Sequence, residues 1–217
     1  MSGAQQDNMS IAIIGWGSLI WCPGSLKLKT RWFRDGPMLP VEFARISKGD
    51  SLSLVLRPGS SYQTTLWAVS GSEELTDAQV DLQQREGTTY RSSIHHGTVA
   101  GEYSQDVSNN IKDAISAWLP MHPRIDACVW TGLGSNWQKA RDRDFSVGDA
   151  LQYLRGLPDP ARAREYVQNA PSQIQTEVRA AIGAQLNWSD ADLSPVLFEP
   201  VGGGDNRRPE SSKRQQG

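Results

Sequence analysis

Apolar residues in the first two thirds of the chain form short runs or alternate with polar residues, which is typical of β-strands. Residues 11–14 form an uninterrupted run rich in β-branched side chains and predict a buried strand. The other segments expected to be extended lie at residues 41–47, 52–56, 64–69, 88–94, 98–103 and 125–131.

The apolar spacing becomes helical after residue 146, where prolines separate the segments. One earlier helix is marked by its ends. Thr76 and Gln79 match a capping box, and Gly87 suits a left-handed cap after Glu86. The remaining helices are expected at residues 107–119, 147–157, 161–169 and 174–186. Strands followed by helices favour an α+β fold over a doubly wound α/β fold.

The composition fits one globular domain with appendages. The chain has 217 residues, of which 38% are hydrophobic and 21% charged. We expect a flexible leader at residues 1–10, one domain at residues 11–201 and a disordered tail at residues 202–217.

Several classes of partner are not expected. A formal charge of −2 gives no electrostatic reason for nucleic-acid binding, and no apolar run reaches membrane-spanning length. The leader lacks the basic and apolar regions of a secretory signal, and two cysteines are too few for a disulfide framework. These features together predict a cytoplasmic protein.

The strand at residues 11–14 runs directly into Gly-Trp-Gly-Ser-Leu-Ile-Trp at residues 15–21. Glycines at such a point expose successive backbone N–H groups, which suit a carboxylate or a phosphate. A dinucleotide fingerprint is excluded because Ile20 stands where a third glycine is needed, and a P-loop would require Gly-Lys-Ser/Thr. A tight turn with only a structural role is the alternative.

Glu86 is the second candidate. It stands at the expected helix end, where the helix dipole disfavours a carboxylate and so favours its use as a proton carrier. The alternative is a solvated residue paired with Arg85 or Arg91. Metal ligation is not expected, because His95 and His96 are adjacent and would point to opposite faces of a strand.

These two motifs, together with Tyr90 and Arg91, resemble the gamma-glutamylcyclotransferase family. The Gly-Ser-Leu-Ile-Trp form of the loop is most similar to the glutathione-acting branch. The resemblance implies a gamma-glutamylcyclotransferase-like α+β fold, with a small mixed β-barrel-like sheet flanked by helices. It assigns catalysis to Glu86 and substrate binding to Trp16, Gly17, Ser18, Leu19, Ile20 and Tyr90.

Two positions depart from the family pattern. Trp16 stands where the family usually has a tyrosine, and the later pocket tyrosine matches either Tyr153 or Tyr166. Arg45 and Pro58-Gly59 lie where the glutathione-acting branch carries similar residues.

The implied reaction is intramolecular: the α-amine of a γ-glutamyl group attacks the γ-carbonyl, giving 5-oxoproline and a free amine or amino acid. It needs a small-molecule γ-glutamyl substrate and no metal or cofactor. A non-catalytic binding module on the same fold is the alternative, and the leaving group and oligomeric state stay open. The hypothesis requires the Glu86 carboxyl to lie near the amides of residues 17–19.

Overall fold

The larger of two sheets is built around β1 (Ile11–Gly15). The structure is a computed structural model, and it describes residues 9–188. β1 pairs in parallel with β7 (Ala127–Thr131) and antiparallel with β5 (Leu66–Val69). β6 (Ile94–Thr98) completes the order β5-β1-β7-β6. Residues 1–8 of the predicted leader at 1–10, the boundary at residue 201 and the tail at 202–217 lie outside the described residues.

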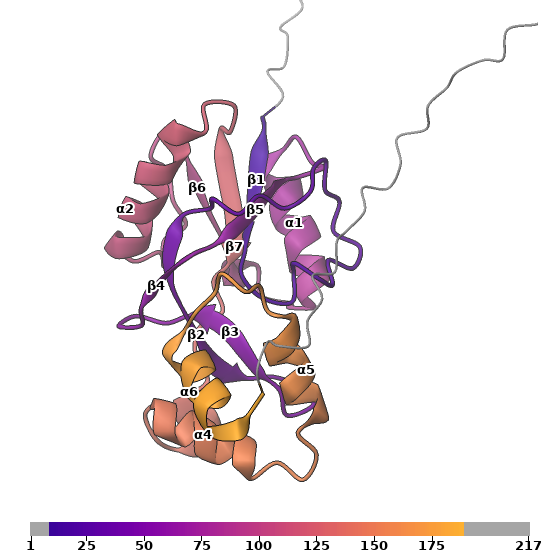
Figure 1. The fold of residues 1–217 in the computed structure, drawn as a ribbon. Helices are drawn as coiled ribbons and strands as arrows, with labels where there is room; N and C mark the ends of the chain where they lie inside the picture. The colour runs from indigo at the N-terminus through magenta and orange to yellow at the C-terminus, as the bar shows by residue number, and fades with distance from the viewer. Residues whose placement is uncertain (1–8, 189–217) are drawn as a thin grey trace, which may run out of the picture.

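Both faces of β1 are covered, which explains its uninterrupted apolar run. Helix α1 (Leu75–Glu86) packs on one face of the sheet and α2 (Asn109–Trp118) lies over the other (Figure 1). Ile11 and Ile13 pack in a cluster with α1, whereas Ala12 and Ile14 join the larger core on the other side. The predicted buried strand is therefore confirmed.

A second sheet has the order β3-β2-β4, from β2 (Met38–Ile46), β3 (Leu52–Leu56) and β4 (Tyr62–Thr64). Helix α5 packs against β3, α6 against β2, and α4 against α6 (Figure 1). The helices of this part of the chain are α3 (Trp137–Arg141), α4 (Val147–Arg155), α5 (Ala161–Asn169) and α6 (Glu177–Leu186).

The predicted α+β class is confirmed, but the barrel-like sheet is not found. Within residues 9–188 the strands form two sheets and close no barrel, because β2 pairs only with β3 and β4 and never joins the β5-β1-β7-β6 ladder. In the same range, no helix has both the length and the apolar character needed to cross a membrane.

The strands expected at residues 88–94 and 98–103 are wrong apart from their ends Ile94 and Thr98, which belong to β6 between them. Residues 88–90 are irregular, and Arg91–Ser93 form a 3-10 turn (η1) in which the Ser93 N–H donates to the Tyr90 carbonyl. Residues 98–103 turn back at once, leaving only a single bridge between Gly97 and Tyr103. Local turn hydrogen bonds replace the strand ladder in both segments.

The helix ends agree with the sequence in part. Gly87 ends α1 at φ 62°, and its N–H donates to the Gln83 and Gln84 carbonyls, as expected for a left-handed cap. The capping box is wrong: α1 begins at Leu75, and its N-cap Glu74 makes no side-chain cap. Helix α6 begins later than expected, because the Thr176 side chain accepts from the Arg179 N–H and caps the helix there.

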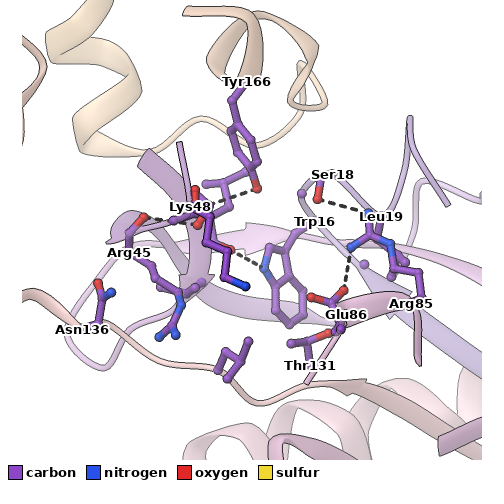
Figure 2. Close-up of a pocket in the computed structure, with 18 of the residues that line it drawn as sticks. Trp16, Ser18, Leu19, Arg45, Lys48, Arg85, Glu86, Thr131, Asn136 and Tyr166 are labelled. Carbon is purple, nitrogen blue, oxygen red and sulfur yellow. Dashed lines mark hydrogen bonds and ion pairs between the residues drawn. The ribbon is translucent and has the colours of Figure 1, made fainter. Parts of the chain in front are cut away.

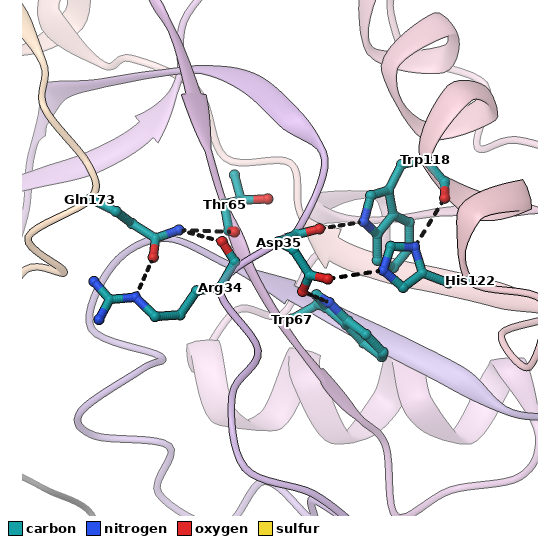
Figure 3. Close-up of polar contacts among 7 residues, drawn as sticks. All are labelled: Arg34, Asp35, Thr65, Trp67, Trp118, His122 and Gln173. Carbon is teal, nitrogen blue, oxygen red and sulfur yellow. Dashed lines mark hydrogen bonds and ion pairs between the residues drawn. The ribbon is translucent and has the colours of Figure 1, made fainter.

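A polar network ties the segment before β2 to the rest of the fold (Figure 3). The Trp67 Nε1 donates to the Asp35 carboxylate at 2.8 Å, and the Trp118 Nε1 donates to the Asp35 carbonyl at 2.8 Å. Burial acts to raise the pKa of the Asp35 carboxyl, but hydrogen bonds from Trp67 and His122 outweigh it and hold that pKa below its ordinary value. Gln173, just before α6, bonds the backbone of the same segment. The network thus joins the segment before β2 to β5, to α2 and to the segment before α6.

Candidate functional site

A cavity of about 650 Å³ lies where the two sheets meet (Figure 2). Its walls come from five places: the chain that leaves β1, the C-terminal end of α1, the hairpin of β2 and β3, the end of β7 with the chain after it, and α5. Small-molecule sites typically have volumes of roughly 300–1,000 Å³. The cavity is thus large enough for a substrate of dipeptide or tripeptide size.

The loop after β1 presents its backbone to this cavity. Its turn is closed by hydrogen bonds from Ile20 N–H to the Gly17 carbonyl and from Cys22 N–H to the Ser18 carbonyl. In the described part of the chain, no backbone carbonyl accepts from the N–H groups of Gly17, Ser18 or Leu19. All three residues line the cavity, so N–H groups of the loop can donate to an anion there, and the amide-lined cup stays a prediction.

Gly17 is required at its position by close packing. A Cβ there would lie 2.6 Å from the Tyr166 hydroxyl, which no unstrained contact allows. Gly15 is confined in the same way by Ile20, whose Cδ1 would lie 2.9 Å from an added Cβ. The two glycines therefore allow the loop to pass beneath α5 and over the Ile20 side chain.

Of the two candidate tyrosines, Tyr166 lines the cavity. Its hydroxyl accepts from the Leu54 N–H at 3.3 Å. Burial raises the pKa of this hydroxyl. Hydrogen bonds from the backbone N–H groups of Leu54 and Ser18 act to lower the pKa but do not offset the burial. The hydroxyl therefore stays protonated at neutral pH. Tyr153 instead donates to the Asp50 carbonyl and packs against Trp137.

The last residue of α1, Glu86, lines the same cavity as the loop. Arg85 joins the two features: its Nη1 is 2.7 Å from the Glu86 Oε1, and its Nη2 donates to the Ser18 Oγ at 3.1 Å. Arg85 Nη2 also donates to the Cys22 carbonyl at 2.7 Å. The Arg85 and Glu86 side chains are only 11% and 17% exposed. Glu86 therefore pairs with Arg85, as the alternative interpretation expected, but it is not a solvated residue.

The opposite wall carries Arg45, which the sequence matched to the glutathione-acting branch without assigning it a role, and Lys48, which the sequence did not indicate. A β-bulge explains the position of Arg45. Phe43 faces Leu54 across the ladder, but Arg45 faces Ser53, so Ala44 is an extra residue in β2. Residues 43 and 45 would share a face in a regular strand, whereas the bulge turns Arg45 to the other face. Bulges leave no mark in the alternation of residues 41–47.

The predicted substrate-binding residues fall into two groups. Trp16, Gly17, Ser18 and Leu19 line the cavity, and the Trp16 Nε1 donates to the Leu54 carbonyl at 3.3 Å. Ile20 packs behind Gly15 rather than lining the cavity. The Tyr90 side chain is 72% exposed and lies outside the cavity, so we leave it out of the site.

Among residues 9–188, no group of three or more His, Cys, Asp and Glu side chains is placed to hold a metal ion. Cys22 is an exposed free thiol and Cys128 a buried one.

Comparison with protein-family models, with curated proteins and with solved structures found no match to this chain. The case for an activity therefore depends on the cavity and on the two sequence motifs that line it.

Proposed function

We propose that this chain is a gamma-glutamylcyclotransferase-like enzyme, which cyclises a γ-glutamyl group to 5-oxoproline and releases an amine or amino acid. The observation that carries the proposal is the convergence of the loop after β1 and Glu86 on one cavity. The two motifs are linked through Arg85 and Ser18, which are 67 positions apart in the sequence.

The loop provides the binding half of this proposal. The N–H groups of Gly17 and Leu19 are not used by backbone carbonyls and can hold the α-carboxylate of the γ-glutamyl group, while the Ser18 N–H faces the Tyr166 hydroxyl. A second N–H of the loop can donate to the oxygen that gains negative charge as the γ-carbonyl is attacked. Holding both ends of the short glutamyl chain bends it towards the ring, which supplies several kcal/mol of the barrier.

Glu86 provides the proton transfer. An α-ammonium cannot attack, so its proton first moves to the Glu86 carboxylate. The amine nitrogen then forms a bond to the γ-carbon, and the bond from that carbon to the leaving nitrogen breaks as Glu86 returns the proton to that nitrogen. The ring nitrogen gives its second proton to the Glu86 carboxylate, which passes it to the released amine, so that the products are 5-oxoproline and an ammonium group. Arg85 holds the carboxylate in position by its 2.7 Å ion pair.

The test is release of 5-oxoproline from glutathione, γ-glutamyl dipeptides and γ-glutamylamines, measured by chromatography with mass detection. Glu86→Gln preserves shape and removes the proton carrier, so kcat should fall by a factor of about 10²–10⁴ with folding retained. Glu74→Gln is the matched control, because it makes the same change at an exposed position beside α1. Full activity in Glu86→Gln would overturn the role of this residue.

A non-catalytic binding module is the second candidate, and the engagement of Glu86 by Arg85 favours it. In that case, calorimetry would detect binding of γ-glutamyl compounds by the unmodified protein, while no 5-oxoproline forms from any of them.

A further inference from the structure

Positive charge on the wall opposite Glu86 is not balanced within the cavity. Figure 2 shows Arg45 and Lys48 on one side and Arg85 with Glu86 on the other, with Trp16 between them. The charged residues that line the cavity are these three cations and one carboxylate, and Glu86 already pairs with Arg85. Among residues 9–188, neither Arg45 nor Lys48 forms an ion pair.

Arg45 is held ready for a ligand. Its side chain is half-buried, and its Nη1 donates to the Gly134 carbonyl at 2.8 Å, which fixes the guanidinium in the cavity wall. A guanidinium has five N–H donors in a planar fork, a shape that matches a carboxylate. One of these donors is used by Gly134, so others are available to a ligand.

The strand end that carries these two cations is also fixed. The Asn136 side chain accepts from the Ile46 N–H at 3.0 Å and donates to the Ile46 carbonyl at 2.9 Å. Ile46 lies between Arg45 and Lys48 in the chain, so Asn136 fixes the backbone from which both side chains project. Lys48 itself is exposed at the mouth of the cavity, where an ammonium group can meet a charged substrate.

We propose that Arg45 and Lys48 form a second anion subsite, which binds a carboxylate on the leaving group. This inference depends on the proposed function, in which the loop of residues 17–19 takes the α-carboxylate. A γ-glutamyl amino acid or peptide carries a further carboxylate that can meet this wall, whereas a γ-glutamylamine does not. The favoured substrates are therefore γ-glutamyl amino acids and peptides.

The experiment uses a matched pair of substrates, γ-glutamylalanine and γ-glutamylethylamine, which differ only by the leaving-group carboxylate. We expect kcat/KM to be at least about tenfold higher for γ-glutamylalanine, which corresponds to about 1.4 kcal/mol. Lys48→Gln and Arg45→Gln should each reduce this preference by lowering kcat/KM for γ-glutamylalanine alone. Lys139→Gln, at an exposed position on α3, is the control and should change neither value.

Two results would overturn the subsite. One is equal or faster turnover of γ-glutamylethylamine by the unmodified enzyme. The other is an equal loss with both substrates in Arg45→Gln, which would mean that this guanidinium binds the α-carboxylate that both share. Lys48→Gln keeps the test valid if Arg45→Gln fails to fold, because Lys48 is exposed.

Failure of the proposed function would look different. If neither substrate yields 5-oxoproline, the cyclisation proposal is wrong, and calorimetry with the same two compounds then tests the subsite. Tighter binding of γ-glutamylalanine that weakens with added salt, and that is lost in Lys48→Gln, would support the subsite. Equal affinity for the two compounds, or no binding of either, would overturn it.

Discussion

The contact between Gly17 and Tyr166 predicts a specific pair of compensating substitutions. A Cβ at residue 17 would lie 2.6 Å from the Tyr166 hydroxyl, whereas ordinary contacts begin at 3.4 Å. Gly17→Ala therefore forces a displacement of about 0.8 Å in the loop or in α5. Overpacking of this kind typically lowers the free energy of unfolding by about 1–3 kcal/mol.

Tyr166→Phe should relieve this strain. The next atom of that side chain, Cζ, would lie 3.8 Å from the added Cβ, which is an ordinary contact. By itself Tyr166→Phe removes the acceptor of the Leu54 N–H, and we expect it to lower the free energy of unfolding by about 1–3 kcal/mol. The double variant should lose about 1–2 kcal/mol less free energy of unfolding than the sum of the losses in the two single variants.

Urea unfolding of the four proteins, followed by tryptophan fluorescence, measures this coupling. Gly183→Ala is the control, because an added Cβ there meets no atom within 4 Å and Ala is favoured over Gly in a helix. It should raise the free energy of unfolding by about 0.5–1 kcal/mol. Additive losses in the double variant, within about 0.5 kcal/mol, would refute the placement of Tyr166 over the loop.

Two further predictions concern buried groups outside the loop. Burial raises the pKa of the Cys128 thiol, so iodoacetamide at pH 8 should label only the exposed Cys22, and mass spectrometry should find a second label only after unfolding. Burial also raises the pKa of the Glu42 carboxyl in the folded protein. The stabilising contribution of the protonated carboxyl is therefore complete below the pKa that Glu42 has in the unfolded chain, and it is lost as the pH rises through the pKa in the folded protein. The free energy of unfolding of Glu42→Gln, measured in urea, should therefore rise relative to that of the unmodified protein as the pH increases from about 4 to about 7. A constant difference between the two proteins across that range would contradict this.

Several elements could be predicted because their signals are local. The apolar run of residues 11–14 indicated a strand covered on both faces, and Gly87 marked the end of α1. Helices α2, α4 and α5 followed from their apolar spacing and their prolines. Short elements were harder: α3 and β4 were not expected, because five and three residues carry too little periodicity.

The candidate site was predicted in part for the same reason. Residues 16–19 and Glu86 were selected from two short motifs, and both line the cavity. Tyr90 follows Glu86 closely in the sequence, but the turn at residues 91–93 leaves its side chain in solvent. Closeness to Glu86 in the sequence was not enough to place Tyr90 in the site, because a single turn can change the direction of a side chain.

The sequence by itself determined most of the extended and helical segments and selected two motifs that line one cavity, because these depend on periodicity and on glycines. Only the tertiary structure decided that the strands form two sheets, that Tyr166 rather than Tyr153 covers the loop, and that Arg45 and Lys48 face Glu86 across one cavity. These features depend on pairing between distant segments, and above all on the extra residue at Ala44 that turns Arg45 to the other face of β2. A shift of one residue in register reverses the face of a side chain without changing its hydrophobic pattern.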